Sequence, residues 1–332
     1  MLYSNKNIGW VNTGRALSML GIYIAHCNFY YLNLDSTILL FTNLFRIPFF
    51  YFISGFLFFR SLEKYSEKEK LKKIINKLIW PTIFFTSLIW LPKMLVHEKD
   101  TNFIFFVKDV LGGTASWFIS SIIVGQLLLL FVRKFIKNIF FILGIGFIFF
   151  LLAFYLVKIN PDPFPWYYKS GLMSFFFLSL GGVLFVYYDK IKKIISYKLL
   201  IISFIICLIM HCFTFNNGIF QNISLVRYDN IPLGLFNNII GIFFMLQLCH
   251  YIPEIKWLQY IGKNSMLFYF FGGGVPLLLG YIVKSYIPLQ GYIMTICIII
   301  LSMAIVFPIS YIINKYFSWT LDFSKITKLV KK

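Results

Sequence analysis

Ten long apolar runs constrain this chain more than any other feature of its sequence. Each has roughly 17–25 residues, the length that a helix needs to cross the hydrocarbon core of a bilayer. The connections between them are short, and no large polar insert interrupts the series. We therefore expect an all-α membrane protein, a bundle of about ten transmembrane helices forming a single domain over residues 1–332. The expected spans are 14–34, 38–59, 79–97, 116–132, 139–157, 171–188, 199–215, 233–250, 264–284 and 291–313.

Composition points the same way. The chain is 59% hydrophobic and 13% charged, whereas a soluble domain is about 25% charged. Its formal net charge of +19 lies in short basic blocks between the apolar runs. This distribution argues against a nucleic-acid partner and favours a protein that contacts membrane lipids.

The positions of Lys and Arg predict the orientation of the spans, because cytoplasmic loops carry an excess of basic residues. With a cytoplasmic N-terminus, 22 of the 31 basic residues fall in inside segments and 7 in outside ones. We therefore expect both termini in the cytoplasm, with a basic tail over 314–332. The inner segment 60–77 is expected to form a surface helix, and 101–113 to lie flat at the outer interface.

Several polar residues lie within the first two apolar runs. A charge inside a span costs at least about 2.5–3.5 kcal/mol and usually faces a functional, polar interior. Arg15 and His26 are 11 residues apart, so they share one helix face and lie about 16 Å apart along its axis. On the returning second run, Arg46 is predicted at the depth of His26. Ser54 and Gly55 are predicted near the level of Arg15.

Each of these residues also has a structural interpretation. Arg15 can extend to the lipid headgroups, and a histidine within a span is often a helix–helix hydrogen-bond partner. Arg46 is deeper, and no acidic residue within an expected span neutralises it, which favours an anionic ligand. The sequence has no Cys/His spacing typical of a metal site and no phosphate-binding glycine loop, so no metal is expected.

Four motifs resemble those of the acyltransferase-3 family of membrane enzymes. RALSMLGIYIAH (15–26) is similar to the family's Arg-x10-His signature, and FRIPFFYFISGFLF (45–58) to its second-span pattern. SWFISSIIVGQLL (116–128) resembles the Trp-Phe motif that opens the fourth span, and IGKNSMLFYFF (261–271) resembles the late Gly-Lys-Asn-Ser motif. The resemblance covers residues 10 to about 313.

The resemblance implies an O-acyltransferase of the bacterial cytoplasmic (inner) membrane. Such enzymes take an acyl group, usually acetyl from cytoplasmic acetyl-CoA, and place it on a hydroxyl of a cell-surface polysaccharide or lipid-linked sugar. By position, His26 becomes the central catalytic residue. The chain departs from many relatives by having Phe270 and Phe271 where a histidine follows the late motif. We also expect no fused hydrolase-like domain of the kind that some members carry, so a second transfer step would need a partner such as a polysaccharide-assembly protein.

The polar residues suit acyl transfer from coenzyme A. We expect Arg15, with Lys72 and Lys73 of the inner segment, to bind the phosphates of acyl-CoA. Ser54 and Gly55 are expected beside the coenzyme, which reaches into the bundle along the face shared by Arg15 and His26.

Two chemical roles are expected deeper in the bundle. His26 either takes the proton of the acceptor hydroxyl or is itself transiently acylated, and the sequence leaves both open. Arg46 is expected to stabilise the oxyanion of the thioester or to orient the sugar. The rival hypotheses are a transporter or flippase for a glycan or lipid intermediate, and a non-catalytic lipid-binding or assembly subunit.

Overall fold

The structure, a computed structural model, describes residues 9–27, 41–96, 102–286 and 291–326. Within this part of the chain, eight helices are long and apolar enough to cross a membrane. Each coincides with one of the expected spans, so the prediction of a multi-pass helical bundle is confirmed at this level. The eight are Phe41–Leu62, Thr114–Phe135, Ile139–Ile159, Tyr168–Val186, Tyr197–Asn216, Ile231–Tyr251, Ser265–Val283 and Gly291–Tyr316.

The other two expected spans differ from these eight. Helix α1 (Gly9–Cys27) begins before the expected 14–34, and the rest of that span lies outside the described residues. Helix α5 (Trp80–Val96) has 17 residues, about the lower limit for crossing a bilayer. The count of ten and the cytoplasmic termini therefore remain predictions.

The elements follow the order of the apolar runs, with short helical segments and one small hairpin between them. The hairpin, between α11 and α12, joins strands β1 and β2 in antiparallel register and was not expected from the sequence. Beyond α1 and α5, the helices are α3 (Arg46–Leu62), α4 (Glu67–Ile74), α6 (Phe103–Phe106), α7 (Trp117–Phe135), α8 (Ile139–Ile159), α9 (Tyr168–Val186), α10 (Tyr188–Lys192), α11 (Tyr197–Asn216), α12 (Ile231–Tyr251), α13 (Lys256–Lys263), α14 (Ser265–Tyr286) and α15 (Gly291–Tyr316). The π- and 3-10 segments are η2 (Ile75–Ile79), η3 (Val107–Leu111), η4 (Thr114–Ser116), η5 (Ser318–Leu321) and η6 (Phe323–Lys325). The strands are β1 (Gln221–Asn222) and β2 (Arg227–Tyr228).

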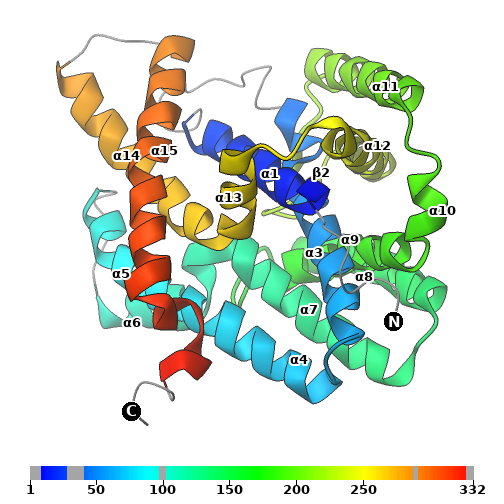
Figure 1. Cartoon of the computed structure of the whole chain (residues 1–332), viewed down its shortest axis with the longest axis horizontal. Coiled ribbons are helices and arrows are strands. Elements are labelled where there is room, and N and C mark those ends of the chain that lie inside the picture. Colours follow the sequence, from blue (N-terminus) through cyan, green and yellow to red (C-terminus); the bar gives the residue numbers. More distant parts are fainter. Residues whose placement is uncertain (1–8, 28–40, 97–101, 287–290, 327–332) are drawn as a thin grey trace.

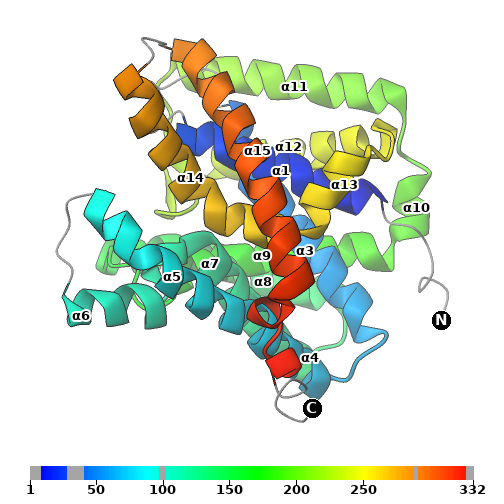
Figure 2. The same ribbon diagram turned by 60° about the vertical axis from the view of Figure 1, so that its left-hand side comes forward.

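The helices surround a central region in which α1, α3, α7 and α14 meet (Figure 1). In the turned view of Figure 2, α4, α10 and the carboxyl end of α15 lie towards one side of the molecule. Helix α6 and the carboxyl end of α14 lie towards the other side. Helices α4 and α10, which lie in lysine-rich connections, are thus on the same side of the molecule, and we refer to this side as the basic side.

Helix α3 crosses α9 at very short range because small residues meet there. A β-carbon added to Gly55 would lie 1.9 Å from the carbonyl oxygen of Leu178, and one added to Gly181 would lie 1.9 Å from that of Phe52. Glycines permit such close approach of helix backbones in membranes, where packing rather than hydrophobic exclusion drives association. Gly55 therefore contributes to the packing of α3 against α9.

Helix α1 lies inside the bundle and contacts α3, α12, α13 and α14. The Tyr23 hydroxyl donates to the carbonyl oxygen of Phe268 (2.9 Å) on α14. Asn12 donates to the Gln259 side chain (2.9 Å) on α13. These contacts tie the first helix to segments far away in the sequence and fix the direction of its polar face.

Helix α4 is the surface helix that the sequence predicts between the second and third runs. Ser66 accepts a hydrogen bond from the Glu69 backbone, and the Glu69 carboxylate accepts from the Ser66 backbone N–H (2.8 Å). This capping box satisfies N–H groups at the helix start and stabilises the beginning of α4. Lys137, after α7, forms an ion pair with Glu67 (2.8 Å), which joins α4 to the rest of the basic side.

Candidate functional site

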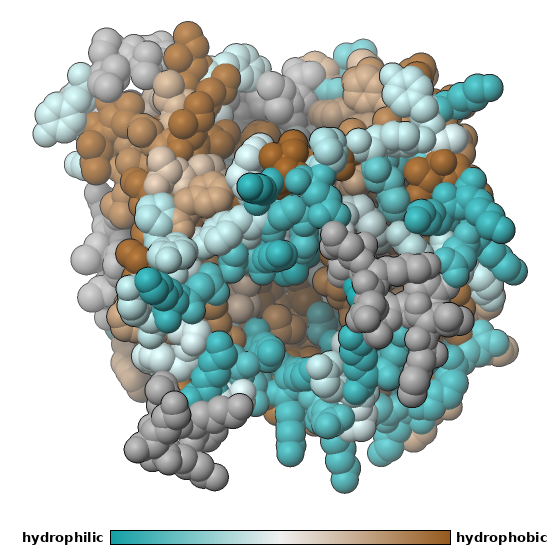
Figure 3. Space-filling view, viewed as in Figure 1, coloured by the Kyte–Doolittle hydropathy of each residue, from teal (hydrophilic) through white to brown (hydrophobic). Residues whose placement is uncertain are grey.

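A cavity of about 160 Å³ lies where α1, α3, α4, α7 and α14 meet. In the space-filling view of Figure 3 a hollow opens in the middle of the face, with hydrophilic residues around it and hydrophobic ones deeper. Comparison with Figure 1 puts this hollow between α13, α3, α4 and α7. The cavity is lined by Arg15, Met19, Phe50, Ser54, Leu57, Phe58, Lys70, Leu78, Phe118, Ile119, Ile122, Gln126, Ser265, Met266 and Tyr269.

The cavity is cationic. Arg15 and Lys70 are its charged lining residues, and none of the described residues that line it is acidic. Ser54, Gln126 and Ser265 add hydroxyl and amide groups to the wall. Cations together with hydrogen-bond donors, and no carboxylate, favour an anionic ligand over a cationic one.

Arg15 is held by two neighbours from other helices. Its guanidinium donates to the Ser265 hydroxyl oxygen (2.7 Å), 250 residues away in the sequence. Its central carbon also lies 5.7 Å from the centre of the Phe50 ring on α3, within the range of a cation–π contact. The side chain is thereby directed into the cavity and fixed there.

Ser265 is a site residue that sequence reasoning missed. It belongs to the IGKNS motif, whose resemblance to the family pattern gave no role to the serine. Its helix α14 begins at this residue, and the side chain is completely buried. The motif itself was the signal, because a buried hydroxyl at a helix start is available to partner a charged group.

Ser54 and Gly55 diverge although they are adjacent in α3. Ser54 lines the cavity with Arg15, so its predicted level is consistent with the structure. Gly55 is not among the lining residues, because it faces Leu178 on α9. Successive residues of a helix point about 100° apart, which is why one faces the ligand cavity and the other the packing interface.

The lysines of α4 likewise differ in whether they face the cavity. Lys72 is exposed, and Lys73 packs its ammonium against the Tyr65 ring. Neither lines the cavity, whereas Lys70 does, with its ammonium nitrogen 4.5 Å from the centre of the Phe58 ring. Burial, with a smaller contribution from the charge of Lys73, lowers the pKa of Lys70 to about 8.

The sequence contains a pattern that indicates the inward direction of Lys70. Lys70, Ile74 and Leu78 recur at a spacing of four, so they share one helix face. Ile74 is buried and Leu78 lines the cavity. The apolar positions therefore mark the face that turns inward, and Lys70 is on it.

Arg46 lies beyond the cavity, at the first residue of α3. It faces Gly21 of α1: a β-carbon added to Gly21 would lie 3.0 Å from that of Arg46. Its guanidinium donates to the Thr42 hydroxyl oxygen (2.9 Å), one turn back along the chain. Arg46 thus sits against α1 between the levels of Arg15 and His26, while its side chain extends away from the Arg15 end of α1.

His26 is half-buried and is the second-last described residue of α1. It does not line the cavity. Met19, which is fully buried, does line it. On an α-helix Met19 lies within about 40° of both Arg15 and His26, so the shared face predicted from the sequence runs from the cavity through Met19 towards His26.

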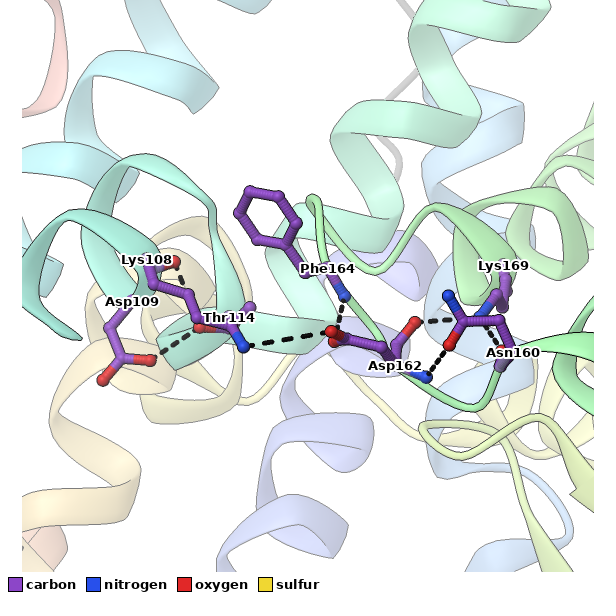
Figure 4. Close-up of polar contacts among 7 residues, drawn as sticks. All are labelled: Lys108, Asp109, Thr114, Asn160, Asp162, Phe164 and Lys169. Carbon is purple, nitrogen blue, oxygen red and sulfur yellow. Dashed lines mark hydrogen bonds and ion pairs between the residues drawn. The ribbon is translucent and has the colours of Figure 1, made fainter. Parts of the chain in front are cut away.

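A second polar cluster lies at the amino end of α9, opposite the end that leads into α10 (Figure 4). The ammonium of Lys169, 3% exposed, donates to the carbonyl oxygens of Asn160 and Asp162. The Asp162 carboxylate accepts from the Phe164 N–H (2.9 Å) and lies 3.9 Å from the Lys108 ammonium. These contacts hold the 160–169 connection against the segment that follows α6. The polar groups of this cluster thus bond to one another.

The segment expected to lie flat at the interface, 101–113, is described from residue 102 and comprises α6 and η3. Phe103 and Ile104 are 76% and 75% exposed. Such exposed apolar side chains on a short helix suit contact with the bilayer surface, and that location stays a prediction. Within the described part of the chain, no group of three His, Cys, Asp or Glu is arranged to hold a metal ion.

Comparison with known proteins places these motifs in one family. The acyltransferase domain model of the acyltransferase-3 family matches residues 8–315. Neither curated proteins nor solved structures gave a match. Because the family match spans nearly the whole chain, the chain belongs to the acyltransferase-3 family and is a membrane O-acyltransferase.

Proposed function

Because the chain is an acyltransferase-3 enzyme, we propose that it transfers an acyl group, acetyl in the first instance, from cytoplasmic acyl-CoA to a hydroxyl of a cell-surface polysaccharide or lipid-linked sugar. Its membrane would be the bacterial cytoplasmic membrane, with the basic side facing the cytoplasm. The family match supports acyl transfer. The choice of donor rests on the cavity.

The observation that carries the proposal is the cationic cavity beside α4. Acyl-CoA is a polyanion with a narrow, uncharged arm that ends in the thioester. A cavity with Arg15 and Lys70, polar groups from Ser54 and Gln126, and apolar walls suits both parts of that molecule. The basic connections around α4 and α10 would also attract the coenzyme from solution.

In the proposed reaction, the acceptor hydroxyl oxygen attacks the thioester carbonyl, and the carbon–sulfur bond breaks to release coenzyme A as its thiol. In this direct route His26 takes the hydroxyl proton as general base and returns it to the departing sulfur. In the alternative route its ring nitrogen attacks the thioester carbonyl and displaces the sulfur, which takes the ring N–H proton; the acceptor hydroxyl then attacks the acylated ring and gives its proton to the ring nitrogen that is released. Arg46 stabilises the negative charge that develops on the carbonyl oxygen. Either route needs the thioester to pass from the Arg15 end of α1 to the His26 end.

On the donor side, Arg15 holds a coenzyme phosphate, with Ser265 fixing the guanidinium. Ser54 lies in the same wall and donates a hydrogen bond to the arm. Lys72 and Lys73, outside the cavity, remain expected contributors to attraction of the coenzyme. Gly55 permits the close α3–α9 packing behind Ser54.

The test uses purified protein in detergent with acetyl-CoA labelled in the acetyl group. Wild type is expected to bind the coenzyme and to release its thiol slowly, Arg15→Ala to lose binding, and His26→Ala to bind without turnover. Circular dichroism melting checks that both variants are folded. Wild type that neither binds nor turns over acetyl-CoA would overturn the proposed donor, and flux of a lipid-linked glycan would then test the transporter hypothesis.

A further inference from the structure

The lysine-rich helix α4 presents one of its ammonium groups to the donor cavity. Lys70 is half-buried and lines the cavity with Arg15. Lys68 and Lys72 of the same helix are exposed. The sequence therefore shows a run of equivalent lysines, but the fold separates one of them from the rest.

The position of Lys70 is fixed by the way α4 is held. The capping box of Ser66 and Glu69 stabilises the helix one turn before Lys70. Helix α4 packs on α3 and α7, and the Lys137–Glu67 ion pair closes its start. A helix held at its start and along its side cannot rotate freely, so Lys70 stays directed towards the cavity.

The surroundings of the Lys70 ammonium favour an anion. Its nitrogen lies 4.5 Å from the centre of the Phe58 ring, a weaker partner than a carboxylate or phosphate. Lys137 and Lys77, by contrast, pair with acidic side chains. None of the described residues lining the cavity is acidic, and burial lowers the pKa of Lys70, which is what an ammonium group without a counter-charge experiences.

We propose that Lys70 is a donor-binding residue: its ammonium group binds a phosphate of acyl-CoA, together with the Arg15 guanidinium, at the α4 side of the cavity. This inference rests on the proposed function and adds a second phosphate-binding residue to it. The assignment differs from a general role of the basic loop, because it selects one lysine and leaves its neighbours outside the site.

The test compares Lys70→Gln with Lys68→Gln, which removes the same charge two residues away on the exposed face of α4. Binding of acetyl-CoA is measured by calorimetry, and steady-state thiol release gives kcat and KM. We expect Lys70→Gln to weaken binding and to raise KM by about tenfold or more, as loss of one charge-assisted hydrogen bond does. We expect kcat to change little and Lys68→Gln to stay within about twofold of wild type.

A truncated donor separates phosphate binding from a structural effect. S-acetylpantetheine carries the same thioester and arm but no phosphate, so Lys70→Gln and wild type should use it at equal rates. Lys70→Arg should restore most of the acetyl-CoA affinity. Equal behaviour of Lys70→Gln and Lys68→Gln with acetyl-CoA, or an equal loss with S-acetylpantetheine, would overturn the role of Lys70 alone. Absence of acetyl-CoA binding in wild type would overturn the proposed donor and Lys70 together.

Discussion

At the scale of single residues, the donor cavity is characterised by the neighbours of its two cations, Arg15 and Lys70. Arg15 has a hydroxyl and an aromatic ring as neighbours, and Lys70 has an aromatic ring. Neither arrangement neutralises a positive charge. The two cations of the cavity are oriented for a ligand that supplies the negative charge itself.

The Arg15–Ser265 hydrogen bond should contribute to coenzyme binding. Replacing Ser265 with Ala removes the acceptor at 2.7 Å but keeps the guanidinium. We expect acetyl-CoA affinity to fall by roughly three- to tenfold, less than in Arg15→Ala, because the charge remains but loses its fixed orientation. Ser61→Ala is the control, since Ser61 bonds to the Phe58 carbonyl oxygen and does not line the cavity. A fall of the same size in both variants would contradict the prediction.

Coenzyme binding should depend on pH through Lys70. Its pKa is lowered to about 8, so the group is protonated below that pH and neutral above it. An anion binds the protonated form, so acetyl-CoA affinity should be highest below pH 8 and fall as the pH rises through 8 to 9. Calorimetry across pH 6.5–9.5 measures this, and Lys70→Gln should show a flatter profile over the same range.

Several ionisable groups surround the Lys70 amine. The Lys70→Gln variant separates their effect on binding from that of Lys70. Arg15 and Tyr269 line the same cavity, and Lys73 lies one turn further along α4. Lys137 and Lys77, on the segments packed against α4, are paired with carboxylates. A pH profile as steep in Lys70→Gln as in wild type would assign the titration to one of these groups instead.

At the scale of helices, two contacts set the geometry of the site: the α3–α9 crossing and the polar face of α1. The crossing fixes which side of α3 faces the cavity, because Gly55 must face α9. Ser54 is then directed to the cavity wall. The face of α1 connects that wall to the predicted catalytic histidine.

The α3–α9 crossing should not tolerate a larger residue at Gly55. In Gly55→Ala the new methyl group would lie 1.9 Å from the Leu178 carbonyl oxygen, so the helices must separate. We expect a loss of at least about 1–3 kcal/mol in stability, seen as a lower melting temperature. Gly144→Ala on α8 is the control, since nothing lies within 4 Å of its added β-carbon. A Gly55 variant with normal stability and weakened coenzyme binding would instead support the direct role expected from the sequence.

Met19 should control passage from the cavity to His26. It is fully buried on the face that Arg15 and His26 share, and it lines the cavity. Met19→Phe replaces a flexible side chain with a rigid one, so we expect kcat to fall by about tenfold or more with coenzyme affinity little changed, whereas Met19→Leu should stay close to wild type. An unchanged kcat in the phenylalanine variant, with the protein folded, would exclude this path.

At the scale of the whole molecule, the cavity lies beside α4, which contributes Lys70 to its lining. Helices α4 and α10 lie on one side (Figure 2), and the hollow is in a hydrophilic region (Figure 3). This arrangement places the proposed coenzyme site beside α4, on the basic side of the molecule. Because the proposed donor is cytoplasmic, the side of the membrane that α4 faces directly tests the proposal.

Helix α5 decides whether the segments on its two sides face opposite compartments. Lys68 and Lys108 are both exposed and lie before and after α5. If α5 spans the membrane and the termini are cytoplasmic, Lys68→Cys should react with an impermeant maleimide only from the cytoplasmic side, and Lys108→Cys only from the outer side. Both are made in a background without the five native cysteines. Labelling of both from one side would reduce the number of spans and place α5 along the surface.

The sequence by itself determined the helical membrane architecture, the eight helices of the described residues that are long and apolar enough to cross a membrane, the surface helix α4 and the family. These properties follow from local composition and periodicity: an apolar run of sufficient length must be a helix in a bilayer. The spacing of Arg15 and His26 on one face is equally local. The count of ten spans, the orientation and the roles of His26 and Arg46 remain sequence-based predictions.

Only the tertiary structure decided which polar residues share the cavity. Arg15 meets Ser265 across 250 residues of sequence, Lys70 faces inward while Lys72 does not, and Gly55 faces α9 while Ser54 faces the cavity. Periodicity fixes the angle of a side chain about its own helix, but the neighbour on that side is set by long-range packing. A chain of apolar helices offers many such pairings, and the close crossings and interhelical hydrogen bonds select one of them.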